Sequence, residues 1–155
     1  MTATTQVLDF LQPQDAIVDL AASSKQKVLQ FVSERAAQAL GLASSDVLHA
    51  LLSREKLGST GVGEGIALPH TRISGLAKPY GVLVRTAKPL NFDAIDEAPV
   101  DIVFGLVLPT ENEKEPLNAL ACVTRRLRTP GVLQKMRESR TADEIYAAIT
   151  GMGCS

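Results

Sequence analysis

The sequence predicts a single α/β domain in which a mixed β-sheet is flanked by helices on both faces. Short apolar runs typical of strands interleave with longer amphipathic segments typical of helices. Their spacing lacks the regular β-α-β repeat that an all-parallel sheet requires. The length of 155 residues and a hydrophobic share of 45% suit one full-sized core. Residues 1–155 are therefore treated as one domain, with frayed ends expected at residues 1–6 and 151–155.

The N-terminal part predicts a strand followed by a helix. Residues 16–20 (AIVDL) form an apolar run, after a shorter apolar segment that Pro13 closes. Ser23 and Gln26 have the spacing of a capping box, so the first long helix is expected to begin there. Gly41 follows the last apolar residue of the helical pattern and is expected to end it.

A second helix leads into the most informative stretch of the chain. Ser44 or Ser45 is predicted to cap this helix, which delivers Arg54 to residues 54–72, reading REKLGSTGVGEGIALPHTR. Four glycines fall within eight residues here. Glycines at this density allow positive φ angles and bring backbone N–H groups close to a ligand. We predict an anion-binding loop, although a plain flexible turn also explains the glycines.

A histidine follows this loop. Residues 66–68 (IAL) predict a short buried strand, which places His70 where a strand emerges into a loop. Binding and catalytic side chains favour such a position, because a rigid element aims them. The hydroxyl groups of Ser59 and Thr60 add donors nearby. Since a free imidazole is about three-quarters neutral at pH 7, it can attack without a strong base. The pattern predicts a nucleophilic histidine beside an anion-binding loop.

Two familiar glycine motifs are absent from this stretch. No Lys-Ser or Lys-Thr pair follows a glycine, as a phosphate-binding P-loop requires. The pairs Gly61–Gly63 and Gly63–Gly65 lack the further glycine, three residues on, that a dinucleotide-binding fingerprint requires. Neither a nucleotide nor another cofactor is expected.

The second half predicts the centre of the sheet. Residues 82–84 read as a strand, and residues 88–92 as a short edge piece, since Pro89 cannot donate to a ladder. The most continuous apolar run is residues 101–108 (DIVFGLVL). It predicts a central strand buried on both faces and stopped by Pro109.

Three helices are expected to complete the domain. Pro116 suits the first turn of a long helix that residues 130–131 (PG) end. A short helix at residues 132–136 follows. A capping box at residues 141–144 opens the last helix, which ends at Gly151. The inward-facing stripe of the long helix is predicted to be Leu117, Leu120, Ala121, Thr124 and Leu127.

Composition excludes several classes of protein. A net charge of −1 and a sequence pI of about 6.1 argue against a nucleic-acid-binding domain. No apolar run approaches the ~20 residues that span a bilayer, and the first residues lack a basic signal region. Cys122 and Cys154 show no metal-ligand spacing and fit a reducing cytoplasm. No clustered carboxylates suggest magnesium. We expect a cytoplasmic protein without membrane insertion or metal, in which His49 is a surface side chain.

Residues 54–63 and 65–70 together carry a family resemblance. They resemble the active-site segment of enzyme IIA components of the bacterial phosphotransferase system, mannitol/fructose type, and most closely the nitrogen-regulatory branch. The likeness extends to residues 92–96 (FDAID) and 99–101 (PVD) and covers most of the chain. It implies the same layered α/β fold. It also implies that His70 accepts a phosphoryl group from a histidine phosphocarrier protein.

The resemblance and the residue types together suggest a site. An arginine can grip two phosphoryl oxygens at once, and Arg54 matches the family's active-site arginine. Glu64 matches a glutamate of mannitol-type relatives and is a possible orienting group for a ring nitrogen of His70. The groups predicted to stabilise the phosphoryl group are Arg54, Ser59, Thr60 and Gly61.

One position departs from the family pattern. Many relatives carry a second active-site histidine where this chain has Pro116, and some nitrogen-type relatives carry another where it has Asn118. Proline has no donor to replace the imidazole. The side-chain amide of Asn118 is a donor that substitutes in part.

Four functions remain open at this stage. The preferred one is a regulatory phosphoryl carrier, with the phosphocarrier protein upstream and regulated potassium transporters or sensor kinases downstream. A sugar-specific enzyme IIA that passes phosphate to a IIB component is the second. A non-catalytic module that binds an anion or a protein is the third. The fourth is a small hydrolase that uses His70 with Glu64 or Asp93.

Overall fold

The computed structural model describes residues 5–110 and 114–151. The predicted frayed ends lie largely outside these residues, as does Cys154. Within the described ranges the first half consists of a short 3-10 helix η1 (Val7–Asp9), β1 (Leu11–Leu20), α1 (Lys25–Leu40), α2 (Ser44–Lys56), β2 (Gly61–Gly63), β3 (Ile66–Ala67) and β4 (His70–Ile73). The second half consists of β5 (Tyr80–Leu90), β6 (Val100–Pro109), α3 (Lys114–Arg128), α4 (Val132–Glu138) and α5 (Ala142–Thr150).

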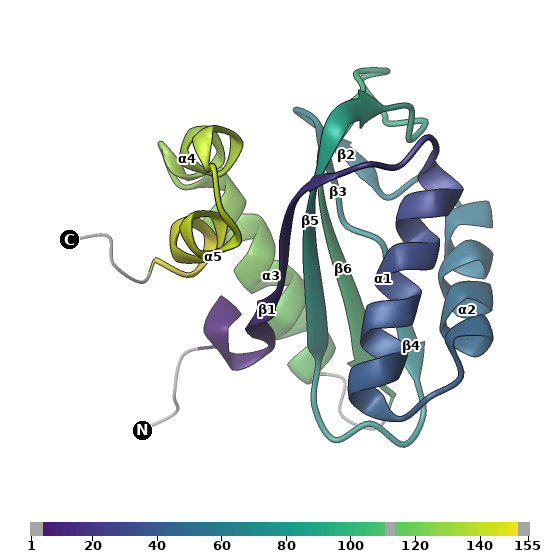
Figure 1. The fold of residues 1–155 in the computed structure, drawn as a ribbon. Helices are drawn as coiled ribbons and strands as arrows, with labels where there is room; N and C mark the ends of the chain where they lie inside the picture. Colours follow the sequence, from purple (N-terminus) through teal and green to yellow (C-terminus); the bar gives the residue numbers. More distant parts are fainter. Residues whose placement is uncertain (1–4, 111–113, 152–155) are drawn as a thin grey trace.

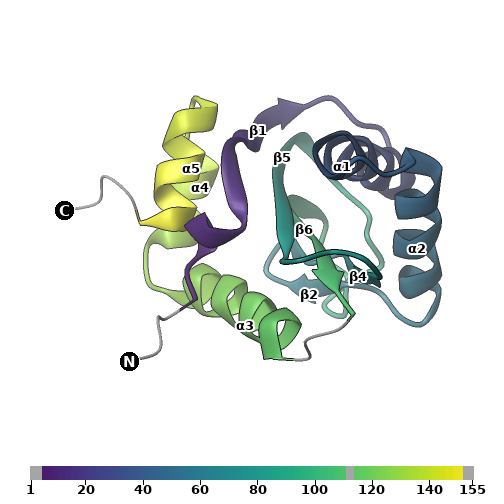
Figure 2. The ribbon, with the colours of Figure 1, turned by 90° about the horizontal axis from the view of Figure 1, so that it is seen from below.

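A mixed sheet of six strands forms the middle of the domain (Figure 1). The strand order is β1-β5-β6-β3-β2, and β4 also pairs with β6. The β5–β6 and β2–β3 pairs are antiparallel, whereas β1–β5, β3–β6 and β4–β6 are parallel. Helices α1 and α2 cover one face of the sheet, and α3, α4 and α5 cover the other (Figures 1 and 2). The predicted fold class is therefore confirmed.

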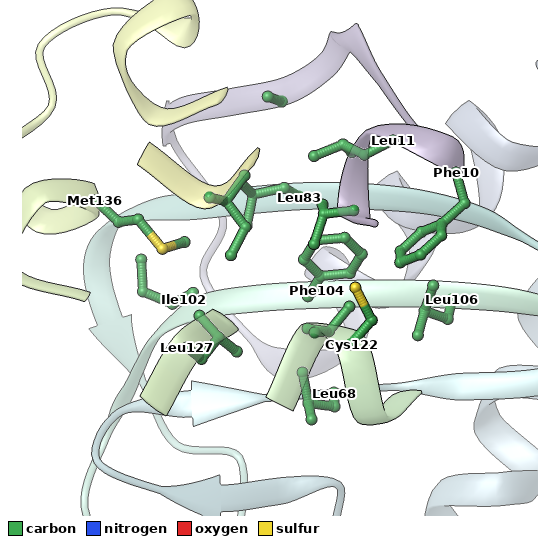
Figure 3. Close-up of a cluster of buried hydrophobic side chains, with 14 of the residues drawn as sticks. Phe10, Leu11, Leu68, Leu83, Ile102, Phe104, Leu106, Cys122, Leu127 and Met136 are labelled. Atoms are coloured by element: carbon green, nitrogen blue, oxygen red, sulfur yellow. The ribbon is translucent and has the colours of Figure 1, made fainter. Parts of the chain in front are cut away.

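Strand β6 is buried on both faces, as residues 101–108 predicted. Ile102, Phe104 and Leu106 belong to the core cluster that includes residues of α3, α4 and α5 (Figure 3). Val103 and Val107 belong to the cluster on the α1–α2 side. Side chains alternate between the faces of a strand, so a strand packed on both faces needs apolar residues throughout.

Strands β3 and β4 run along β6 in one register. Ile66 lies opposite Ile102, and His70 lies opposite Leu106. The two residues between them, Leu68 and Pro69, interrupt the ladder without shifting it. This arrangement places the histidine-bearing strand directly beside the central strand.

The edges of the sheet differ from the sequence-based expectation. Strand β1 begins at Leu11 and continues through Pro13, so it starts earlier than residue 16. Pro13 is tolerated because β1 is an edge strand, and the β1–β5 register shifts between Leu11 and Ala16. Residues 88–90 are the end of β5, with Leu90 opposite Val100, rather than a separate edge piece.

The helix starts also need correction. Ser24, not Ser23, caps α1, because its hydroxyl oxygen accepts from the Lys27 N–H at 3.3 Å. Helix α2 begins after Ala43 without a side-chain cap, so neither Ser44 nor Ser45 has the predicted role. The predicted end of α1 is confirmed, since Gly41 adopts a left-handed φ of 70° that glycine tolerates.

The last helix shows half of its predicted capping box. Thr141 accepts from the Glu144 N–H at 3.1 Å, but the Glu144 carboxylate accepts from the Arg140 N–H instead of the Thr141 N–H.

The predicted inward stripe of α3 is confirmed at Leu127 and in part at Leu120, which is half-buried against the same core cluster; at the other positions it is wrong. The described residues of α3 that are buried are Ala119, Cys122, Val123 and Leu127, whereas Leu117 is 61% exposed. Both stripes have helical spacing, so periodicity alone did not separate them. The small side chains of Ala119 and Cys122 face the sheet, and the hydroxyl of Thr124 bonds the Leu120 carbonyl of its own helix.

Candidate active site

The glycine-rich segment forms a tight hairpin. Strands β2 and β3 pair, and the chain reverses through Gly63 (φ 101°), Glu64 (φ 58°) and Gly65 (φ 79°). Gly63 is the last residue of β2 and leads into the turn of Glu64 and Gly65, and the three successive positive φ angles explain both glycines, because residues with a Cβ rarely adopt them. Gly61 has another role: a Cβ there would lie 2.8 Å from the Cβ of Ala94.

His70 is the first residue of β4, so the prediction that it lies in a loop after a strand is wrong. Its half-buried ring lies beside the Leu68–Pro69 interruption, and its Nδ1 atom is 2.7 Å from the Leu68 carbonyl oxygen. A carbonyl oxygen only accepts, so Nδ1 carries the proton of the neutral ring. This geometry leaves Nε2 as the ring nitrogen with a free lone pair; the nucleophilic role of His70 stays a prediction.

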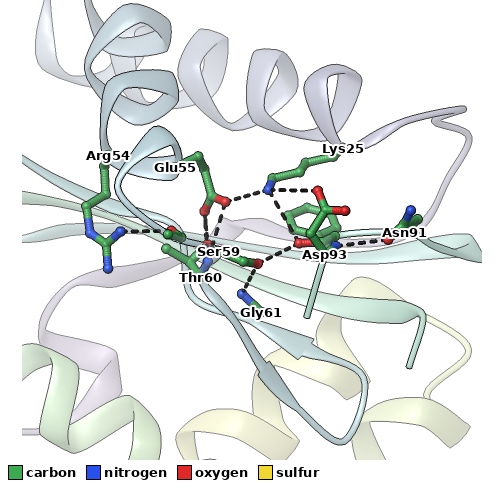
Figure 4. Close-up of polar contacts among 10 residues, drawn as sticks. Lys25, Arg54, Glu55, Ser59, Thr60, Gly61, Asn91 and Asp93 are labelled. Carbon is green, nitrogen blue, oxygen red and sulfur yellow. Dashed lines mark hydrogen bonds and ion pairs between the residues drawn. The ribbon is translucent and has the colours of Figure 1, made fainter. Parts of the chain in front are cut away.

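Ser59 and Thr60 both use their hydroxyl groups inside the protein. Thr60 is 3% exposed, and its N–H and Oγ1–H both donate to the Glu55 carboxylate (Figure 4). The Ser59 hydroxyl donates to the Phe92 carbonyl and accepts from the Gly61 N–H at 3.0 Å. Stabilisation of a phosphoryl group by these residues stays a prediction. It now requires donors to exchange partners.

The backbone amides of the predicted anion-binding loop are similarly occupied. The Thr60 N–H is bound to Glu55 at 3.2 Å, the Gly61 N–H to Ser59, and the Glu64 N–H to the Asp96 carboxylate at 3.0 Å. Side-chain oxygen atoms therefore already accept from these three amides. Sequence reasoning expected glycine density to leave these donors open.

Arg54 is the most available donor group of the predicted set. One Nη1–H donates to the Gly58 carbonyl at 3.0 Å (Figure 4). This bond holds the guanidinium at the start of residues 58–65, called the glycine segment below. Within the described part of the chain, this carbonyl is its one hydrogen-bond partner. A guanidinium has five N–H donors, so the remaining ones can serve a ligand.

The loop after β5 supports the hairpin from the side. The Ile95 N–H donates to the Gly61 carbonyl at 3.4 Å, and the Asp96 carboxylate accepts from Glu64 and Ala98. These hydrogen bonds lower the pKa of Asp96 below its ordinary value, and the bond from the Glu64 N–H has a larger effect than that from Ala98. In the sequence, residues 92–96 contributed only to the family resemblance, and their support of the hairpin was not predicted. Their aspartates, which are typical of turns, could have indicated a structured loop here.

Glu64 does not lie near His70. It is at the hairpin tip, where Arg137 of α4 donates to its carbonyl and also binds the Asp101 carboxylate at 2.9 Å. The tip precedes Ile66, whereas His70 pairs four residues further along β6, a distance of about 13 Å. The contact described for a His70 ring nitrogen is with the Leu68 carbonyl, not with Glu64, so the orienting role of Glu64 stays a prediction that this geometry does not favour.

Asn118, the predicted supporting residue, lies on a helix that covers the sheet face of His70, and its role stays a prediction. Paired residues of a parallel ladder share a face, and Leu106, opposite His70, belongs to the cluster packed against α3. Asn118 is exposed in the first half of α3, the helix that covers this face. Pro116 lies in its first turn, as predicted. His49 is exposed on α2, also as predicted.

A comparison of sequences identifies the family. The family model "Phosphoenolpyruvate-dependent sugar phosphotransferase system, EIIA 2" matches residues 9–152. The chain belongs to this enzyme IIA family.

Individual relatives of this enzyme IIA are similar over nearly its whole length. A nitrogen regulatory protein of Klebsiella oxytoca is 41% identical over 149 residues, which cover 96% of this chain and 92% of the relative. The crystal structure of nitrogen regulatory protein IIA-Ntr from Neisseria meningitidis has a TM-score of 0.85 and 31% identity, covering 92% of this chain and 97% of that one.

A more distant structure shares the fold. Mannitol enzyme IIA of Escherichia coli, solved in complex with phosphorylated enzyme IIB, has a TM-score of 0.69 at 21% identity, covering 88% of this chain and 95% of that one. Among the described residues of this enzyme IIA, no helix is both long and apolar enough to cross a bilayer.

Proposed function

We propose that this enzyme IIA is a regulatory phosphoryl carrier that is phosphorylated on Nε2 of His70 by a histidine phosphocarrier protein. The observation that carries the proposal is the 2.7 Å contact between His70 Nδ1 and the Leu68 carbonyl. It leaves Nε2 with a lone pair, at the start of β4 and at the end of the segment that resembles the family's active site. Phosphoryl transfer needs mainly alignment and charge stabilisation, so an oriented imidazole and a nearby guanidinium suffice in principle.

The transfer step balances without a further reactant. The Nε2 lone pair of His70 forms a bond to phosphorus while the phosphorus–nitrogen bond of the phosphocarrier's histidine breaks. The departing electron pair stays on the carrier's ring nitrogen. The guanidinium of Arg54 grips the equatorial oxygens, where charge accumulates. The absence of any metal or cofactor requirement stays a prediction.

Mass spectrometry of the intact protein tests this proposal. Incubation with phosphoenolpyruvate, enzyme I and the phosphocarrier protein is expected to add one acid-labile phosphoryl group to the wild type. His70→Ala is expected to add none. His49→Ala is the matched control, because it removes the other histidine of the sequence from an exposed helix position. Unmodified wild type, or a phosphorylated His70→Ala variant, would contradict the mechanism and favour a binding module.

The regulatory branch is favoured by the relatives. The name nitrogen regulatory protein belongs to relatives such as that of Klebsiella oxytoca. We propose by extension that the downstream partners are regulated transporters or sensor kinases in the cytoplasm. Efficient transfer of the phosphoryl group onward to a sugar-specific IIB component would instead favour the second function.

Phosphorylation is proposed to act on these partners through local charge. A phosphoryl group adds about −1.5 to −2 charges at neutral pH. Exposed apolar side chains on the elements that border the site suit docking, namely Leu57, Val62, Ile95 and Leu117. Partner titrations are expected to show weaker binding to the phosphorylated protein, or to His70→Asp, than to the free form. Equal affinities would remove support for the switch.

A further inference from the structure

We propose that Lys25 and Glu55 are positioning residues for His70. Their ion pair fixes Thr60, and Thr60 in turn fixes the backbone segment that orients the imidazole. The inference deepens the proposed function, because it assigns the support of the same nucleophile to two residues outside the glycine segment.

The Glu55 carboxylate is the centre of this support. Its side chain is 6% exposed, and its Oε2 atom lies 2.6 Å from Nζ of Lys25 (Figure 4). The same carboxylate accepts from the N–H and the hydroxyl of Thr60. Three donors from two segments therefore converge on one buried carboxylate, and the charge on Lys25 compensates it.

Two further hydrogen bonds connect Thr60 to the imidazole. The Thr60 carbonyl accepts from the Leu68 N–H at 2.9 Å. The Leu68 carbonyl accepts from Nδ1 of His70 at 2.7 Å. Leu68 and Thr60 are both buried, so water does not readily replace a lost partner. A displacement of Thr60 would move Leu68 and release the ring.

Lys25 joins this path to the loop after β5. Its Nζ is 3.4 Å from the Phe92 carbonyl, 3.8 Å from the Asp93 carboxylate and 5.5 Å from the centre of the Phe92 ring. The Phe92 carbonyl also accepts from the Ser59 hydroxyl. Lys25 thus links α1 both to Glu55 at the end of α2 and to the loop after β5, and these two segments hold the β2–β3 hairpin.

The locations of these charges favour positioning over stability. Lys25 is the first residue of α1, and Glu55 lies in the last turn of α2. Each charge is at the end of the helix where the macrodipole disfavours it. A buried ion pair is also often no more stabilising than apolar residues of the same volume. What this pair provides is a fixed geometry among α1, α2 and the glycine segment.

The test uses two variants and two measurements. Glu55→Gln keeps the shape and removes the charge, and Lys25→Met keeps an apolar stem over Phe92. Nitrogen-15 NMR of the His70 ring reports the fraction of the Nδ1–H tautomer in the unphosphorylated protein. Single-turnover transfer from the phosphocarrier reports the rate. In metal sites, losing a group that orients a histidine costs about 10- to 100-fold in activity, and we expect the same order here with a reduced Nδ1–H fraction.

Asp15→Asn is the matched control. Asp15 is a carboxylate with a 5% exposed side chain, paired with Arg35 of the same helix α1. This control is expected to leave the tautomer and the rate unchanged. The inference is wrong if Glu55→Gln and Lys25→Met both keep the wild-type tautomer, or if Asp15→Asn shifts it equally. Since the tautomer is measured without any phosphocarrier, a failure of phosphorylation in wild type would refute the proposed function separately.

Discussion

Two buried carboxylates bind the same helix α1 and differ in what they connect. Glu55 pairs with Lys25 and accepts from the hydroxyl of Thr60. Asp15 pairs with Arg35 at 3.5 Å and likewise accepts from a hydroxyl, that of a tyrosine. The types of interaction and the burial are nearly the same.

The hydroxyl partners separate the two networks. Thr60 lies in the glycine segment, and its backbone leads to Leu68 and His70. Tyr80 begins β5 beside the irregular start of β1, and its network stays within α1, β1 and β5. The comparison teaches that two buried charges with similar partners differ in the backbone segments they hold, and on our proposal this difference, not the strength of the pairing, gives Glu55 its role at the site.

The largest expected effect comes from adding a hydrogen-bond donor at the position where the family resemblance implies a second active-site histidine. Pro116→His restores an imidazole where many enzyme IIA relatives have one. A charge-assisted hydrogen bond contributes about 1.5–3 kcal/mol, or roughly ten- to a hundredfold in rate. Single-turnover transfer is therefore expected to accelerate, with a small loss of stability because a preorganised first-turn residue is removed.

Asn118→Ala completes this experiment. If Asn118 substitutes in part for the missing imidazole, its loss slows transfer in the wild-type background. A folded Pro116→His protein that is no faster would show that the missing imidazole does not limit the reaction.

The second effect concerns Arg54, where a substitution is expected to change the rate of phosphoryl transfer but not the thermal stability. Arg54 neighbours Glu55 in sequence but lies outside the buried network. Arg54→Lys keeps a charge and loses the planar fork, so about one hydrogen bond, or roughly tenfold in rate, is lost. The thermal midpoint is expected to stay nearly unchanged, as for most surface substitutions. Unfolding of this variant would assign Arg54 a structural role instead.

The third effect compares two buried threonines. Thr60→Val removes the hydroxyl bonded to Glu55, and Thr86→Val removes one that donates to the Lys88 carbonyl at 2.7 Å. Both are expected to lose about 1–3 kcal/mol of unfolding free energy in denaturant titrations. Only Thr60→Val is expected to slow phosphoryl transfer as well. Equal slowing by both variants would indicate a general loss of rigidity.

The smallest effect is the pH dependence of stability that arises from Tyr80, the hydroxyl partner of Asp15. Burial, followed by the hydrogen bond to Asp15, raises the pKa of Tyr80 above its ordinary value of about 10. Above pH 10 the unfolded chain releases this proton while the folded chain keeps it, so stability falls as pH rises. Tyr80→Phe is expected to lose less stability between pH 9 and 11, by no more than about 1 kcal/mol. Its phosphorylation rate at pH 7 is expected to equal that of wild type.

The sequence by itself determined the family, the central strand at residues 101–108 and the identity of His70 as the candidate nucleophile. These features depend on local pattern: a continuous apolar run, a glycine-rich segment and a histidine after a proline. The end of α1 could also be predicted locally, because the left-handed conformation that ends a helix needs a glycine at a single position, here Gly41.

Only the tertiary structure decided which donors and charges meet. Lys25 and Glu55 are thirty positions apart, and no helical or strand period relates them. The register of β3 and β4 on β6 separated Glu64 from His70, although they are close in sequence. Packing of small side chains against the sheet chose the buried face of α3. Such contacts depend on how the elements are placed in space, and local propensity contains no information about that placement.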